Sequence, residues 1–254
     1  MTYQLQTAGM WKRISALVLD FILLSLLAVG FVTAIGFAVG YDSANDRLAE
    51  RYDYFESTYG IKLGITNEEY QQLPKEQQEK YDEVGRIISE DAETAAAYKR
   101  VVNLTLLMTS LGIFLAFLAL EFFVPLWLKN GQTVGKKVFN LCVVDQNAVK
   151  VGNVALFVRG MLGKYAIETM IPVFMFFLIF FNGIGMLGLV LIGLIILLQA
   201  VLLSVTRNRS AIHDLLAATV VVDGATQKIF DTREQMLAAL EEEKEYRESR
   251  DKDY

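Results

Sequence analysis

The stretch KRISALVLDF, residues 12–21, opens the first long apolar run of the chain and carries two charges into it. Arg13 and Asp20 are seven positions apart, almost two turns of a helix, so their side chains share one face about 10 Å apart. A charge at the centre of a bilayer costs about 3 kcal/mol on insertion scales, and an anchor alone would favour leucine at both sites. Asp20 therefore predicts a cation or hydrogen-bond donor facing it from elsewhere in the protein.

Apolar residues make up 54% of the 254 residues and are gathered into long runs. Residues 14–40 contain one charge, Asp20, residues 101–128 contain one, Glu121, and residues 169–206 contain none. About 20 apolar residues cross a bilayer, so the last run is long enough for two crossings, near 166–181 and 185–206, separated by the turn FFNGIGM at 180–186. The sequence predicts an all-α polytopic membrane protein with a four-helix transmembrane bundle.

Basic residues predict the orientation. Residues 129–164 hold six lysines and arginines against one acid, and further basic residues precede the first run and follow the last. Basic flanks stay on the cytoplasmic side, so we expect a multi-pass protein of the cell (inner) membrane with both termini cytoplasmic. Residues 41–100, with 14 acids against 8 bases, would then face outward.

Local signals divide the rest of the chain. Gly60 is expected to end a first outer helix, Thr66 and Glu69 have capping-box spacing, and Pro74 suits the first turn of a helix that continues toward the second span. The expected organisation in chain order is an N-terminal interfacial segment with the first span (1–40), a small helical ectodomain (41–100), the second span (101–128), a cytoplasmic segment with a short β-hairpin and an interfacial helix (129–164), a hairpin of the third and fourth spans (165–206), a cytoplasmic HDLL segment (207–230) and an acidic tail helix (231–254).

Three blocks of this sequence resemble the RDD family of membrane proteins, named for one arginine and two aspartates. They are AGMWKRISALVLDFILL (8–24), NGQTVGKKVFNLCVVDQNAVKVG (130–152) and TRNRSAIHDLLAATVVV (206–222). The resemblance implies that the signature residues are Arg13, Asp20 and Asp214 and that they converge. It also implies transport roles, including cation/proton exchange, or an assembly role of the kind seen in eukaryotic relatives. Residue 148 is alanine where family members usually have a turn glycine.

Two groups of residues are candidate sites. Ionisable groups near the membrane can bind a cation or protons, or they can be a structural clamp that pins the C-terminal segment to the first helix, because breaking a buried pair costs about 3–5 kcal/mol. This group comprises Arg13, Asp20, Glu121, His213 and Asp214. The second group is a turn with exposed amides expected to contact lipid headgroups: Gly131, Gln132, Thr133, Gly135, Lys136 and Lys137. We expect Glu168 to form an ordinary ion pair beside Lys164 and Arg159.

The sequence contains no nucleophile with a neighbouring base, no metal-ligand spacing and no cofactor loop, so we expect neither an enzyme nor a bound cofactor or metal. The GQTVGKK stretch lacks the spacing of a phosphate loop. We expect the partners to be the lipid bilayer and monovalent cations or protons, with homo-oligomers because four spans are few for a pathway, and no nucleic acid. The alternative is a membrane scaffold that recruits proteins through the ectodomain or the acidic tail.

Overall fold

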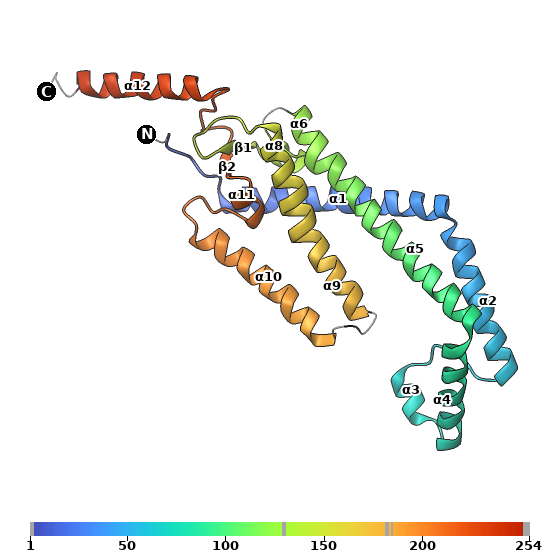
Figure 1. Ribbon diagram of the computed structural model, residues 1–254. Coiled ribbons are helices and arrows are strands. Elements are labelled where there is room, and N and C mark those ends of the chain that lie inside the picture. Colours follow the sequence, from blue (N-terminus) through green and yellow to red (C-terminus); the bar gives the residue numbers. More distant parts are fainter. Residues whose placement is uncertain (1–2, 129–130, 181–182, 184, 251–254) are drawn as a thin grey trace. The chain divides into compact units, whose positions relative to one another are not determined.

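The computed structural model describes residues 3–128, 131–180, 183 and 185–250. Four helices in these ranges are long and apolar enough to cross a membrane: Met10–Val39, Ala92–Trp127, Asn153–Phe180 and Gly185–Val205 (Figure 1). Few of their large apolar side chains are buried, and many, such as Phe21 and Leu26, are exposed, as expected for helices whose solvent is lipid. The predicted fold class, an all-α polytopic membrane protein, is confirmed.

Two of these long helices contain π-helical turns. The second candidate span consists of α5 (Ala92–Phe117), the π-helical η1 (Leu118–Phe123) and α6 (Val124–Trp127). The third consists of α8 (Asn153–Phe157), the π-helical η2 (Val158–Met170) and α9 (Ile171–Phe180). The interfacial helix and the third span, expected as separate segments, thus form one helix of 28 residues. Part of the turn that follows, at residues 181, 182 and 184, lies outside the described residues.

The chain forms two compact units, one of residues Val29–Ile113 and one of the segments on either side of it. In the first unit, Gly40 (φ 70°) precedes α2 (Tyr41–Tyr59) and Gly60 (φ 60°) ends it as predicted. The predicted capping box is present before α3 (Asn67–Gln72), where the Glu69 N–H donates to Thr66 Oγ1 at 3.2 Å and the Thr66 N–H donates to Glu69 Oε2 at 2.7 Å.

The expected continuous helix into the second span is interrupted once. Helix α4 (Lys75–Glu90) stops at Asp91, whose carboxylate accepts a hydrogen bond from the Thr94 N–H at 2.8 Å and so caps the start of α5. Arg51 on α2 donates to the same carboxylate at 2.8 Å. This ion pair fixes the break between the two helices.

The second unit contains a two-stranded sheet whose strands are distant in sequence. Strand β1 (Leu141–Asp145) pairs antiparallel with β2 (Thr219–Asp223), with Leu141 opposite Asp223. The hairpin expected within 129–164 is reduced to a turn and an isolated bridge between Val144 and Lys150. After the turn, the backbones of Ala148 and Lys150 form hydrogen bonds with Phe230, while β1 is paired with β2.

The sheet has two buried faces. Leu141, Val143 and Val221 pack on one face against Ala8 and against Ala16 of α1 (Met10–Val39). The opposite face, formed by Cys142, Val144, Val220 and Val222, packs against Leu5 and Ile229. Successive side chains of both strands point to opposite faces, and the side chains of one face attach the start of the first span to the sheet.

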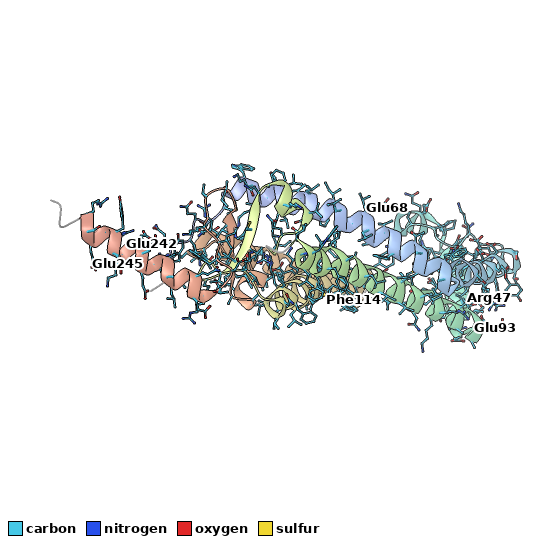
Figure 2. All side chains as sticks on the ribbon, turned by 90° about the horizontal axis from the view of Figure 1, so that it is seen from above. Arg47, Glu68, Glu93, Phe114, Glu242 and Glu245 are labelled. Atoms are coloured by element: carbon cyan, nitrogen blue, oxygen red, sulfur yellow. The ribbon has the colours of Figure 1, made fainter. Side chains whose placement is uncertain are left out.

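The acidic tail is attached at its beginning only. Met236 on α12 (Arg233–Arg250) is buried with Phe230 and Ala148, and the residues from Glu241 to Arg250 are exposed. Ala148 adopts the left-handed conformation (φ 61°) that glycine favours, and its methyl group fills this small cluster. Figure 2 labels Glu242 and Glu245 on the exposed turns of α12.

Candidate functional site: an ionic cavity

A cavity of about 460 Å³ lies in the second unit. Its walls come from the start of α1, from η1, η2, α9 and α10 (Gly185–Val205), and from the short helices α7 (Val134–Val138) and α11 (Ile212–Leu216). Much of the lining is apolar, including Phe21, Phe117 and Phe176. The ionisable lining residues are Arg13, Asp20, Glu121, Lys136, Arg159, Lys164, Glu168, His213 and Asp214.

Asp214, one of the expected signature residues, lines the cavity and is held there by several contacts. Its Oδ1 accepts a charge-assisted hydrogen bond from Arg159, which also donates to Thr219 Oγ1 at 2.7 Å. Its Oδ2 accepts from the Ala211 N–H at 3.1 Å and lies 4.0 Å from a guanidinium nitrogen of Arg13. Burial alone would raise the pKa of Asp214, but Arg159 and the other nearby cations outweigh burial and hold that pKa below its usual range.

Arg13 has a second contact that holds it in place. Its Nη1 donates to the carbonyl oxygen of Arg209 at 2.5 Å. The structure thus brings Arg13 and Asp214 together, as expected, and it ties the first helix to the segment after the fourth span.

Asp20 does not join this pair, which corrects the expected triad. Its Oδ2 accepts from the Thr133 hydroxyl, its Oδ1 accepts from the Gly135 N–H at 2.7 Å, and Lys136 Nζ lies 3.8 Å away. The first turn of α7 provides hydrogen-bond donors directly opposite Asp20, whereas Asp214 is already held by Arg159. The sequence predicted that Asp20 has a partner, and in the structure this partner is the GQTVGK segment.

That segment also differs from the headgroup contact expected for it. Gly131, Gln132, Thr133, Gly135 and Lys136 are buried within the protein, and only Lys137 is exposed. Gln132 donates to the carbonyl oxygen of Leu141 at 2.9 Å, which fixes the segment to β1. The amides and hydroxyl expected to face lipid instead bind Asp20 and the sheet.

A comparison with protein families matched this chain to the RDD family over residues 7–218, most of its length. The chain belongs to the RDD family. No curated protein and no solved structure matched it. The matched range contains every ionisable residue of the cavity, so the cavity lies in the RDD region. The acidic tail of this RDD protein lies outside the match.

Glu121 pairs with Lys164 rather than with Arg13. Lys164 Nζ lies 2.6 Å from both carboxylate oxygens of Glu121, and both side chains are about 10% exposed. Gly160 packs closely against the backbone of Glu121, where an added Cβ would lie 2.8 Å from the Glu121 carbonyl oxygen. The small residue lets η1 and η2 approach closely enough for the two charges to meet.

Glu168 pairs with His213, not with Lys164 or Arg159. His213 Nδ1 lies 2.9 Å from both oxygens of Glu168, so this nitrogen carries the proton, and the His213 backbone N–H donates to the same carboxylate at 3.0 Å. Gln199 of α10 donates to Glu168 at 3.2 Å. Burial lowers the pKa of His213 and outweighs its acidic neighbours Asp214 and Glu168, which raise it.

Three residues of the cavity, Arg159, Lys164 and Glu168, were not predicted as site residues from the sequence. Their spacings of five and four residues place them together on a helix wound with π turns, and all three line the cavity. The signal in the sequence was their charge beside a long apolar run. It pointed to headgroups because the helix was expected to end before the span began.

The arrangement is close to electrically balanced. Four carboxylates and four lysines or arginines line the cavity, together with one histidine. Each carboxylate contacts a cation or His213, and no group of three or more metal-ligand side chains was found among the described residues. Such a site can exchange protons or a monovalent ion by rearranging its pairs, or it can hold its helices together.

Proposed function

We propose that this RDD-family protein is a membrane transport protein that exchanges a monovalent cation for protons at the ionic cavity. The observation that carries the proposal is the gathering of four carboxylates on the wall of one cavity of about 460 Å³ between candidate membrane helices. Ionisable residues at membrane depth are costly, and such residues mark ion and proton pathways in many transporters.

The pairing pattern supports exchange rather than simple burial. Most ion pairs of the cavity join two different elements: α1 with α7 and with α11, η1 with η2, and η2 with α11. A cation that enters can take the place of a lysine at one carboxylate, and the charges stay balanced when the displaced lysine releases its proton. From the distribution of basic residues we further propose a cell (inner) membrane location, cytoplasmic termini, and a homo-oligomer, since four spans form a small pathway.

Cation-driven proton flux in proteoliposomes tests this proposal. Asp20→Asn and Glu121→Gln remove one carboxylate each, and Glu242→Gln on the exposed part of α12 is the matched control. We expect at least a tenfold loss of flux in the two cavity variants and none in the control, with thermal stability recorded on the same preparations. Absence of flux in the wild-type protein over a series of alkali cations would overturn the proposal.

A membrane scaffold is the second candidate, and the complete pairing of the cavity carboxylates favours it. Each of the four carboxylates has a partner within 4.0 Å, as a clamp requires. In this case the acidic tail and the residue 41–100 segment would recruit protein partners. Wild-type protein without flux, together with cavity variants that unfold, is the expected result for the scaffold.

A further inference from the structure

The four carboxylates of the cavity are poorly suited to carry the exchanged proton, because each already accepts hydrogen bonds from strong donors. Asp20 accepts from Gly135 and Thr133, and Glu121 receives two contacts of 2.6 Å from Lys164. Asp214 accepts from Arg159, and Glu168 accepts from His213. A protonated carboxyl group at any of these positions would lose a charge-assisted hydrogen bond.

The lysines and arginines of the cavity differ in how closely a carboxylate contacts them and in whether they can release a proton. The guanidinium groups of Arg13 and Arg159 do not release protons in proteins. Lys164 has both oxygens of Glu121 as partners. Lys136, by contrast, has its nearest carboxylate oxygen, Asp20 Oδ2, 3.8 Å away, and its closest described contact is the Thr133 hydroxyl at 3.1 Å.

The contact with Thr133 suits both forms of Lys136. The Thr133 hydroxyl donates its own proton to Asp20, so its oxygen is free to accept from the lysine. An amine donates this hydrogen bond as an ammonium group does. Loss of the proton therefore leaves the GQTVGK segment attached to Asp20.

The surroundings of Lys136 oppose its charge. The side chain is about 90% buried, Lys164 and Arg159 from η2 repel it, and Glu121 from η1 and Asp20 from α1 attract it. Burial is the largest effect, and together with the two cations it lowers the pKa of Lys136 to about 7.

We infer that Lys136 Nζ is the proton-binding site of the cavity: the lysine, not a carboxylate, gains and loses the exchanged proton. With Lys136 charged, four cations balance four carboxylates. When the ammonium group releases its proton, the cavity carries one net negative charge, which a single monovalent cation neutralises. One proton leaves for each cation that enters. This consequence for transport rests on the proposed function, whereas the titration of Lys136 does not.

Thermal unfolding of the full-length protein in lipid nanodiscs from pH 6 to pH 9 tests the site. Lys136→Arg stays charged throughout this range, and Lys137→Arg, at the exposed neighbouring position, is the matched control. We expect the melting temperature of the wild type to rise relative to Lys136→Arg as the pH passes 7, and Lys137→Arg to follow the wild type. A constant difference between wild type and Lys136→Arg over this range would overturn the assignment.

A second measurement, made on the wild type, tests the site even if the Lys136→Arg protein does not fold. Isotopic reductive methylation of the wild type, read by mass spectrometry, gives the rate at Lys136 and Lys137 at each pH. We expect the Lys136 rate to level off near pH 8 while the Lys137 rate still rises about tenfold per pH unit. Parallel profiles, or a Lys136 that is unmodified up to pH 10, would count against the site. Titration of Lys136 without flux would overturn the proposed function and leave the proton site standing.

Discussion

Asp20 on the first candidate span accepts a hydrogen bond from the backbone N–H of Gly135 at 2.7 Å, across 115 positions of sequence. This contact requires a glycine, because a Cβ at residue 135 would overlap the Ala16 carbonyl oxygen and the Asp20 carboxylate. The charge that the first apolar run carries is thus stabilised by donors of the GQTVGK segment, and the segment is held against the helix.

Replacement of Asp20 by asparagine should release this segment. The asparagine side chain can accept one of the two hydrogen bonds, but its NH₂ group faces a donor, and the loss of a charged acceptor costs about 1.5–3 kcal/mol. Cys142, the single cysteine of the chain, reports the release because it is buried and its sulfur lies 3.4 Å from Gln132. We expect alkylation of Cys142 by a small maleimide to be at least tenfold faster in Asp20→Asn.

Asp231→Asn provides the control for this measurement. Asp231 pairs with Lys150 at the surface, where its side chain is 63% exposed, so its loss should leave the alkylation rate of Cys142 unchanged. Equal rates in wild type and Asp20→Asn would mean that the segment is held without Asp20.

The buried pair of Arg159 and Asp214 should contribute more to stability than a surface pair. Asp214→Asn leaves the Arg159 guanidinium without its carboxylate in a site where both side chains are 5% exposed or less. Breaking one partner of a buried pair costs about 3–5 kcal/mol. Lys12→Gln, which breaks the exposed pair with Asp223, should cost less than about 1 kcal/mol.

Chemical unfolding of the three proteins in the same detergent measures these costs. A similar small loss of stability in Asp214→Asn and Lys12→Gln would show that Asp214 is not part of a clamp. A large loss in Asp214→Asn alone is the result expected from the buried pair.

The spans, the helix caps and the need for a partner at Asp20 could be predicted from the sequence because they depend on local composition and spacing. The partner itself could not, because Asp20 and Asp214 lie near the same end of the candidate spans and only the packing of α7 decides between them. The pairing of β1 with β2 was missed for the same reason, since the two strands are 73 residues apart and each reads as a short apolar run.

The charges of the third helix show a different limit. A regular α-helix puts Lys164 and Glu168 on one face and Arg159 on another, and no local rule predicted the π-helical winding of η2. The close approach of α11 to this helix at Gly163 is a tertiary contact, visible in the sequence only as a glycine.

Gly163→Ala should weaken the packing of α11 against η2. A Cβ at residue 163 would lie 2.5 Å from the Cβ of His213 and 2.7 Å from its Cα, and this backbone cannot move without shifting the contact between His213 and Glu168. Overpacking of this kind costs about 1–3 kcal/mol. At Gly193 on α10 no atom lies within 4 Å of an added Cβ, so Gly193→Ala should be neutral or slightly stabilising. Thermal unfolding of both variants makes the comparison, and equal melting temperatures would contradict the close contact.

Acidification should destabilise the protein through His213. Burial lowers the pKa of this histidine below the value of about 6.5 that it has in an unfolded chain, so the unfolded state binds more protons than the folded state between these two values. The free energy of unfolding therefore rises with pH in this window, and it decreases as the pH falls from about 6.5, by at most about 1.4 kcal/mol per pH unit.

His213→Asn keeps a donor for Glu168 but does not titrate, and its stability should change less over pH 5–6.5. Lys136 is present in both proteins, so the difference in unfolding free energy between wild type and His213→Asn isolates the histidine. A difference that stays constant from pH 7 down to pH 5 would mean that His213 binds its proton equally well in the folded and unfolded protein.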